Sequence, residues 1–387
     1  MPTAPETRSV GIPCGYFDAG TCRSCTWLPL DLPTQLERKQ SAVAAAVAAH
    51  VGPGAWELPH PSRPSGFRNK AKLVVGGRRG AVTLGILDGD GLGVDLRDCP
   101  IHDPVIADAI PRLAAAVDEL GLTPYDVARR TGELKHLLLT VSPDGELMAR
   151  FVLRSEGQLR RLEAAVPDIL AAVPGLRVVT ANLQPAHAAI LEGEQERVLS
   201  DADHLPMRLP SVALRLGPRS FFQTNTAVAA ELYRTATEWA TATAPSSLWD
   251  LYCGVGGFAL HAAVAPARPA RVLGIELSPE AIEAARATAA GLGAEAEVRF
   301  VAADAATATA EHGRPDVLVV NPPRRGIGAA LTTWIEDVAV PHVVYSSCNP
   351  TTLARDVAAD RAEAAAVAAT DDALADAAAA PPLNSRP

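Results

Sequence analysis

Short apolar runs alternate with amphipathic stretches through the C-terminal half of the chain. The runs that resemble strands cover residues 247–252, 271–276, 298–302, 317–321 and 343–346, and helical periodicity follows from Phe258 and over 279–292. Short apolar runs bounded by turn residues predict buried strands, and their alternation with helices predicts a doubly wound parallel sheet. We therefore expect an α/β fold with a Rossmann-like architecture for residues 206–356.

The middle of the chain carries a different pattern. Strands that follow one another through turns indicate a mainly β domain with interspersed helices, which we expect over residues 56–205. Its strand-like runs are 71–75, 137–141 and 147–153, and its clearest helix is 157–172. A further helix should lead into the α/β domain, with Thr224 or Asn225 as its N-cap and an end near residue 243.

The composition fits a protein with two or three hydrophobic cores. The chain has 387 residues, of which 48% are hydrophobic. No stretch is long and apolar enough to span a bilayer, and the first ten residues lack the apolar segment of a secretory leader. We therefore expect a cytoplasmic protein with no membrane partner. The net charge of −9 argues weakly against a nucleic acid partner, although a local patch can outweigh the net charge.

One local patch has the opposite sign. Residues 61–80, which we call the basic segment, contain six Arg and Lys and no Asp or Glu. A strand that carries alternate basic residues can follow RNA phosphates, while an amide supplies hydrogen bonds to bases. The candidate RNA contacts are Arg68, Asn69, Lys70 and Lys72. The alternative is a charged face that only contacts solvent.

Four of the six cysteines lie in the first hundred residues, at positions 14, 22, 25 and 99. In a reducing compartment this clustering indicates a metal site more than disulfides. Three thiolates from one short loop and a fourth from elsewhere can complete a tetrahedral set, which suits structural zinc or a [4Fe-4S] cluster. The spacing does not choose between them. The alternative is that Cys99 belongs to a core and the other three have no shared role.

The stretch from Asp250 to Gly257 predicts a tight turn between a strand and a helix. A ligand can approach the backbone closely at such a turn, here at Gly254, and Glu276 ends the next strand, where a carboxylate can accept both ribose hydroxyls. NAD and S-adenosylmethionine both fit this arrangement. The G-x-G-G spacing and the acidic Asp250 disfavour a diphosphate and favour S-adenosylmethionine. Asp304, near the end of the following strand, is a further candidate contact. A purely structural turn is the alternative.

Asn321-Pro322-Pro323 is followed by Arg324. N-methyltransferases with Asn-Pro-Pro need an aromatic residue at that position, whereas an arginine suits a base with carbonyl oxygens, such as uracil. Position 5 of uracil becomes nucleophilic only after a thiolate adds to C6. Cys348 should lie at the end of a buried strand, where Asn349-Pro350 forces a turn. It is therefore the candidate nucleophile, and an ordinary buried cysteine is the alternative.

These motifs together resemble the RNA uracil-C5-methyltransferase family. The matching runs are Phe222–Asn225, Asp250–Gly257, Gly274–Glu276, Asn321–Gly326 and Ser347–Asp356. The resemblance extends over nearly all of residues 10–356 and is most specific in the last run. The chain is most similar to the branch that methylates uracil 747 of 23S rRNA, which has a [4Fe-4S] cluster and lacks an N-terminal TRAM domain.

The resemblance implies roles for individual residues. It implies that the cluster ligands are Cys14, Cys22, Cys25 and Cys99. The first three belong to an iron–sulfur segment, residues 1–55, and Cys99 reaches the cluster from the central domain. It implies Gln223, Tyr252, Glu276 and Asn321 as S-adenosylmethionine contacts and Cys348 as the nucleophile. The implied partner is 23S rRNA, and no protein partner is implied.

The C-terminal stretch departs from the family pattern. The family continues with a strand pair and a His-x-Glu whose carboxylate removes the C5 proton, about 35 residues after the nucleophile. Residues 357–387 are alanine-rich, lack aromatic residues and lack this Glu. We expect them to be disordered or a solvated helix. No general base is identified, so an RNA-binding homologue with impaired catalysis is the alternative to an active enzyme.

Overall fold

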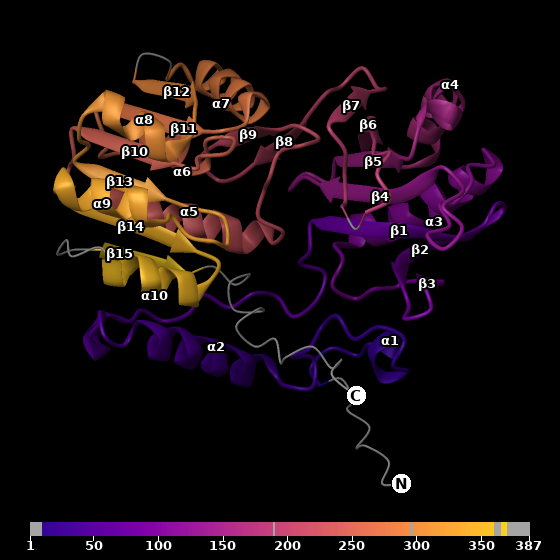
Figure 1. Ribbon diagram of the computed structural model, residues 1–387, viewed down its shortest axis with the longest axis horizontal. Coiled ribbons are helices and arrows are strands. Elements are labelled where there is room, and N and C mark those ends of the chain that lie inside the picture. Colours follow the sequence, from indigo (N-terminus) through magenta and orange to yellow (C-terminus); the bar gives the residue numbers. More distant parts are fainter. Residues whose placement is uncertain (1–9, 189, 295–296, 360–364, 370–387) are drawn as a thin grey trace, which may run out of the picture.

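The computed structural model describes residues 10–188, 190–294, 297–359 and 365–369. It has two lobes, and the N-terminal segment runs beneath both of them (Figure 1). We call residues 70–198 the central lobe and residues 205–369 the C-terminal lobe. Among the described residues, no helix is both long and apolar enough to cross a membrane.

Within the described residues, the central lobe forms a seven-stranded sheet in the order β3-β2-β1-β4-β5-β6-β7. Neighbouring strands are antiparallel except β5 and β6. Helices α3 (Pro104–Glu119) and α4 (Leu159–Ala172) pack on its apolar face. The strands are β1 (Lys70–Arg78), β2 (Ala81–Leu87), β3 (Gly93–Asp95), β4 (Leu134–Val141), β5 (Leu147–Leu153), β6 (Leu176–Leu183) and β7 (Gln195–Val198).

The alternation along β1 decides which side chains reach the solvent. Ala71, Leu73 and Val75 are buried in the core beneath the helices. Because successive side chains of a strand point to opposite faces, Lys70 and Lys72 lie on the other face of the sheet. The positive charges of β1 are therefore turned away from α3 and α4.

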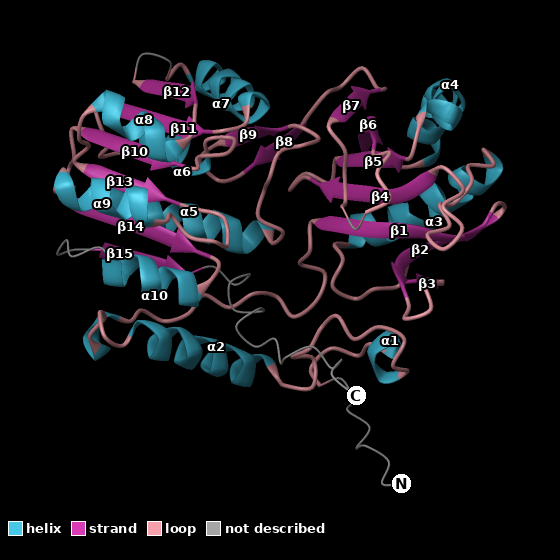
Figure 2. Ribbon diagram, viewed as in Figure 1, coloured by secondary structure: helices cyan, strands magenta, loops and turns pink. Residues whose placement is uncertain are grey.

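In the part of the chain that the structure describes, the C-terminal lobe forms a six-stranded sheet in which neighbouring strands are parallel, in the order β12-β11-β10-β13-β14-β15 (Figure 2). The chain builds outward from β10 to β12 and then returns to β13, so the order reverses between β10 and β13. The strands are β10 (Ser247–Leu251), β11 (Arg271–Glu276), β12 (Val298–Ala302), β13 (Val317–Val320), β14 (His342–Ser347) and β15 (Ala365–Ala369). The doubly wound α/β fold expected from the sequence is confirmed.

Helices cover both faces of this parallel sheet. On one face Leu248 joins a core with residues of the first three helices of the lobe, and on the other face Trp249 joins a core with residues of the last three. These helices are α5 (Thr226–Thr241), α6 (Gly257–Ala263), α7 (Pro279–Leu292), α8 (Ala305–His312), α9 (Ala329–Asp337) and α10 (Pro350–Ala359). A parallel sheet buried on both faces leaves the ends of its strands accessible. Ligands bind at the carboxyl ends, which together form the carboxyl edge of the sheet.

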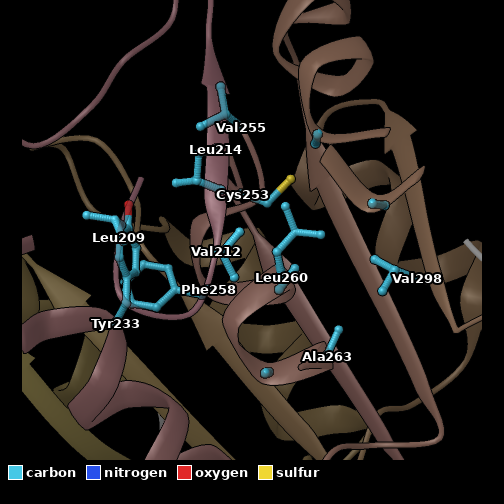
Figure 3. Packing of buried hydrophobic residues seen from close by; sticks show 14 of the residues in the cluster. Leu209, Val212, Leu214, Tyr233, Cys253, Val255, Phe258, Leu260, Ala263 and Val298 are labelled. Atoms are coloured by element: carbon cyan, nitrogen blue, oxygen red, sulfur yellow. The ribbon is translucent and has the colours of Figure 1, made fainter. Parts of the chain in front are cut away.

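Cys253 belongs to the first of these cores. Figure 3 shows it among Leu214, Val255 and Leu260. Burial raises the pKa of its thiol well above the ordinary value, with further contributions from Asp250 and Glu276. Cys253 is thus an inert core residue, although it directly follows Tyr252 in the glycine-rich turn.

Helix α5 starts where the sequence predicts. Its N-cap is Asn225, whose Oδ1 accepts a hydrogen bond from Val228 N at 3.3 Å. Such a cap satisfies one of the free N–H groups of the first turn. A two-stranded hairpin, β8 (Leu205–Arg208) and β9 (Ala213–Leu216), precedes the helix and joins the two lobes.

The N-terminal segment contains two helices that the sequence analysis did not predict. They are α1 (Gly15–Asp18) and α2 (Leu32–Val47), and a short 3-10 turn, η1 (Pro53–Ala55), follows. Asp31 caps α2 by accepting from Thr34 N at 2.8 Å. Helix α2 packs against α10, and its buried residues are Val43 and Val47. A helix from the start of the chain therefore covers one of the last helices.

The expectation for the C-terminal stretch is wrong in one part. Residues 365–369 form β15, which pairs in parallel with β14 from Val343↔Ala365 to Ser347↔Ala369. Pairing at a sheet edge uses backbone N–H and C=O groups, so an alanine-rich sequence without large side chains can still extend a ladder. The rest of the expected tail, residues 360–364 and 370–387, lies outside the described residues.

Asn69 joins the two lobes. Its Nδ2 donates to Gln223 O at 2.9 Å and to Thr226 Oγ1 at 2.8 Å, while its backbone N donates to Thr224 O at 2.8 Å. The Asn69 side chain is buried. A buried amide that donates both of its N–H groups across the joint favours one relative position of the two chain segments.

We expect Asn69→Ala to lower the free energy of unfolding by about 1–3 kcal/mol, because the Gln223 carbonyl and the Thr226 hydroxyl lose a buried partner. Urea denaturation followed by tryptophan fluorescence measures this change. In a double-mutant cycle, Asn69→Ala with Thr226→Val should cost less than the sum of the single variants. Strict additivity would show that the two side chains do not share the interaction.

Candidate active site

The residues that the sequence suggested for the cofactor and the nucleophile meet at one edge of the parallel sheet. Because all neighbouring strands are parallel, their carboxyl ends lie along the same edge. Tyr252 and Asn321 follow β10 and β13, the two strands between which the strand order reverses. Three more residues lie at the carboxyl ends of the other strands. They are Glu276 at the end of β11, Asp304 after β12 and Cys348 after β14.

The turn between β10 and α6 brings the backbone itself to this edge. Tyr252, Gly254 and Gly256 have φ values of 61°, 53° and 83°, so the chain turns through the left-handed region. A Cβ at Gly256 would lie 2.8 Å from the Phe300 ring, whereas a Cβ at Gly254 would meet nothing within 4 Å. The turn is thus packed tightly on its inner side and open above Gly254.

Asp250 lies beneath this turn and is fully buried. Its Oδ2 accepts a hydrogen bond from Ala259 N at 2.9 Å, in the first turn of α6, and among the described residues its Oδ1 has no partner. Burial raises the pKa of this carboxyl to about 7, the hydrogen bond from Ala259 opposes the shift, and repulsion from Glu276 adds to it. In this structure the carboxyl therefore supports the helix start and has one oxygen left over.

Glu276 is held by backbone N–H groups on both sides. Its Oε2 accepts from Gly254 N at 3.2 Å and its Oε1 accepts from Ser278 N at 3.0 Å. Tyr252 is half-buried nearby, and its pKa is raised first by burial and then by Asp304. Asp304 itself caps α8 by accepting from Ala306 N at 2.9 Å. Three of the expected cofactor residues thus lie within electrostatic reach of the open turn.

Cys348 is partly exposed at the end of β14. The turn behind it is fixed, because Asn349 N donates to Ser347 Oγ at 3.0 Å and Asn349 Oδ1 accepts from Thr351 N at 3.1 Å. Cys348 packs against Val43 of α2, and Trp56 packs against the same valine. One side of the thiol therefore has an apolar wall supplied by the N-terminal segment.

The turn after Asn321-Pro322-Pro323 lies beside the cysteine loop. Asn349 Nδ2 donates to Arg324 O at 3.2 Å, and Thr352 Oγ1 donates to the same carbonyl at 3.1 Å. Arg324 and Arg325 are exposed. Two arginines and one thiol are thus carried by neighbouring loops that are hydrogen bonded to each other.

The expected RNA contacts in the basic segment have different surroundings. Lys72 is exposed on the free face of the central sheet. Lys70 is half-buried, and desolvation, followed by repulsion from Arg150 and Lys72, lowers its pKa to about 8. Arg68 is half-buried and its Nε donates to Lys70 O at 3.1 Å. Asn69 is committed to the joint between the lobes, so its amide has no hydrogen left for a base.

The four N-terminal cysteines come together in space. The pKa of Cys25 is raised to about 11, first by burial and then by Cys99, Cys22 and Cys14, while Arg68 acts in the opposite direction. The pKa of Cys99 is raised mainly by burial, with Cys14 and Cys22 adding to the shift. Within the described residues, however, no three His, Cys, Asp or Glu side chains have the geometry of a closed metal site.

Sequence reasoning missed three residues that support the site. Val43 and Trp56 contact the nucleophile's surroundings, but their local patterns carry no functional signal. Asp356, at the end of the most specific motif, is 3% exposed, and a buried charge in a short helix was a signal that only the structure makes visible.

Comparison with known proteins agrees with this geometry. The family model for tRNA (Uracil-5-)-methyltransferase matches residues 194–368. The 23S rRNA (uracil(747)-C(5))-methyltransferase of Halothiobacillus neapolitanus is 47% identical over 349 residues, which are 89% of this chain and 91% of that protein. The corresponding protein of Cronobacter sakazakii is 47% identical over 347 residues, with the same coverage.

A solved structure supports the fold. The tRNA (uracil-54, C5)-methyltransferase of Pyrococcus abyssi, in complex with S-adenosyl-L-homocysteine, superimposes with a TM-score of 0.71. The match has 24% sequence identity and covers 87% of this chain and 79% of that one. With close to half of its residues identical to those relatives over most of their length, the chain belongs to the RNA uracil-C5-methyltransferase family.

Proposed function

We propose that this chain methylates C5 of a uracil in 23S rRNA with S-adenosylmethionine as the methyl donor, and that the target is uracil 747. The observation that carries the proposal is the position of Cys348, which lies partly exposed at the ligand-binding edge beside the arginine-bearing turn. The names of the relatives supply the rRNA and the position within it. An enzyme of this kind acts where ribosomes are assembled, so we propose a cytoplasmic location.

The residues around the glycine-rich turn fit S-adenosylmethionine. The space above Gly254 is open, and the Glu276 carboxylate is held beside it by two backbone N–H groups, ready to accept from ribose hydroxyls. We propose Gln223, Tyr252, Asn321 and Asp304 as the further contacts. The spare oxygen of Asp250 can take a hydrogen bond from the amino group of the methionyl part, through water or after a small movement. When bound, the cofactor supplies an activated methyl group.

Cys348 would act as the nucleophile. Its thiolate adds to C6 of the uracil, and the electron pair of the C5–C6 double bond moves onto C5 and the C4 carbonyl. Arg324 is suited to hold the carbonyl oxygens, because guanidinium groups bind developing negative charge. C5 then takes the methyl group, a base removes the C5 proton, and the C6–S bond breaks to return the thiolate. The target base must leave its RNA stack to reach the thiol.

The base for the proton-removal step is not assigned. Among the described residues after Asp356 there is no Asp or Glu, and Asp356 itself is buried. General-base catalysis typically contributes 10²- to 10⁴-fold, so an enzyme without a positioned base would form its covalent adduct and release it slowly. The identity with the named relatives favours an active enzyme, and slow release of the adduct would be the mark of an impaired homologue.

Cys14, Cys22, Cys25 and Cys99 would hold a [4Fe-4S] cluster. The half-buried thiols of Cys25 and Cys99, whose pKa values are raised by burial and by the neighbouring cysteines, fit a cationic iron centre, because metal binding removes the protons and the repulsion together. The cluster would join the α1 loop to the central lobe. The same four thiols would also fit zinc.

Replacement of the nucleophile should abolish the adduct. With RNA that carries 5-fluorouridine at the target, wild-type protein should form a covalent complex that survives a denaturing gel, since C5 then has no proton to lose. Cys348→Ala should form none, whereas Cys253→Ala, which changes a core thiol, should still form it. On unmodified RNA, normal turnover without trapped complex would exclude the impaired homologue. Absence of any complex with wild-type protein would exclude the covalent mechanism.

The cluster predicts a coloured protein. Anaerobically purified protein should be brown, with iron and sulfide in equal and stoichiometric amounts. Cys25→Ser should lose most of the iron and lower the unfolding midpoint of the N-terminal segment, but it should leave S-adenosylmethionine affinity within about threefold, because the thiols lie outside the cofactor edge. Colourless protein that contains zinc would contradict the iron–sulfur assignment.

Lys72 is the best-placed cation of the basic segment for an RNA phosphate. Lys72→Gln should weaken RNA binding and lower the slope of log affinity against log salt by about 0.7–0.9, as expected for one lost phosphate contact. Arg112→Gln is the matched control, since Arg112 is an exposed cation on α3, which covers the opposite face of the sheet. Equal slopes in all three proteins would mean that this face is only solvated.

A further inference from the structure

Asp356 is a buried carboxylate that the proposed chemistry does not use. It lies in α10, eight residues after the nucleophile, and is 3% exposed. Its Oδ2 accepts from Tyr345 Oη and from Ile327 N, each at 2.8 Å, and its Oδ1 accepts from Arg355 Nη2 at 2.9 Å. A buried charge is stable only when it is fully hydrogen bonded in this way.

The partners of Asp356 come from three different elements. Tyr345 belongs to β14, Ile327 belongs to the turn that carries the two exposed arginines, and Arg355 belongs to α10 itself. Gly326 has φ of 81°, and a Cβ at this position would lie 2.1 Å from Asp356 Oδ2. The turn therefore lies directly on the carboxylate, and a larger residue at Gly326 would lift it off.

A second row of hydrogen bonds fastens the same turn. Arg355 Nη2 donates to Arg325 O at 2.6 Å, and the carbonyl of Arg324 accepts from Asn349 Nδ2 and Thr352 Oγ1. Asp356 orients Arg355 for this contact through its other oxygen. The backbone of residues 324–327 is thus bound at three successive points by the segment that begins with the nucleophile.

We propose that Asp356 is a positioning residue that fixes the arginine-bearing turn relative to Cys348. The inference rests on the proposed function, in which the arginines hold the uracil oxygens while the thiolate adds to C6. Both groups contact the same ring, so their separation must be held within a fraction of an ångström. The turn and the cysteine loop follow different strands, and Asp356 binds the turn through Ile327 N and the strand that carries the cysteine loop through Tyr345 Oη.

Asp356 acts through the turn and not on the substrate. Both of its oxygens are occupied by protein donors, and the side chain is inaccessible to solvent and to a base that enters from the edge. It is therefore not a candidate for the missing general base. Its removal should move Arg324 and Arg325, whereas Glu276 on β11 keeps its hydrogen bonds from Gly254 N and Ser278 N.

The test is the rate of covalent complex formation with 5-fluorouridine RNA under single-turnover conditions. Asp356→Ala should slow this rate by about 100-fold, in line with the effect of a small misplacement of reacting groups. Tyr345→Phe, which removes one of the three donors, should slow it by less than about tenfold. S-adenosylmethionine affinity, measured by calorimetry, should stay within about threefold in both variants.

The matched control is Asp316→Ala. Asp316 is a carboxylate of the same lobe that accepts from Ser246 N and Ser247 N, both at 2.9 Å, but it lies at the amino end of β13. This variant should lose stability and keep the rate of complex formation. If it slows the rate as much as Asp356→Ala does, the effect is general destabilisation and the proposal fails.

Two further outcomes separate this proposal from the proposed function. If wild-type protein forms no complex, the covalent chemistry itself is wrong. If wild-type protein and Asp356→Ala form it at rates within threefold of each other, the chemistry stands and the positioning role is wrong. Should Asp356→Ala fail to fold, Tyr345→Phe combined with Thr352→Val removes one hydrogen bond to Asp356 and one to the Arg324 carbonyl. An unchanged rate in that protein also overturns the proposal.

Discussion

The hydrogen bonds of Asn69 are the contact on which the arrangement of the molecule depends. Through its side chain and its backbone N–H, Asn69 binds the carbonyls of Gln223 and Thr224, in the loop that precedes α5, and the hydroxyl of Thr226, the first residue of α5. One residue earlier, Arg68 N donates to Ile101 O at 2.9 Å, close to Cys99. The loop next to the cofactor edge and the loop that carries the fourth cysteine are therefore held at the start of the same strand.

Helices cover the two sheets differently, so the two lobes offer different surfaces to ligands. The parallel sheet is covered on both faces, so chemistry is confined to its carboxyl edge. The central sheet has helices on one face only. On its other face Arg150 is 3% exposed and is neutralised by Glu196 and Glu192, whereas Lys72 stays exposed. A cation on this face is thus available to RNA only where no neighbouring carboxylate of the protein already neutralises it.

The sequence was sufficient wherever local patterns decide the structure. The bounds of β5, β11, β12 and α7 agree with those expected from hydrophobic runs and their flanking turns, and the cap of α5 was foreseen from one asparagine. The placement of Cys348 at a sheet edge also followed from local signals, because Asn349-Pro350 must end a strand.

Features that depend on distant contacts could not be predicted. Helix α2 has a weak apolar stripe, and only its packing against α10 shows which face is buried. Asn69 was assigned to RNA because its neighbours are basic, but a tertiary contact 154 residues away takes its amide. Strand β15 was missed because its alanine-rich composition argued against a strand, while the open edge of β14 that pairs with it is a property of the whole sheet.

The packing of α2 against α10 has a consequence for how the protein is made. The two helices are roughly 300 residues apart in the chain, and contacts of such long range form late because the intervening segment must be ordered first. During synthesis α2 leaves the ribosome long before its partner exists. The apolar wall beside Cys348 is therefore completed only after the last elements of the sheet are made, whereas the cofactor turn after β10 is made about 100 residues earlier.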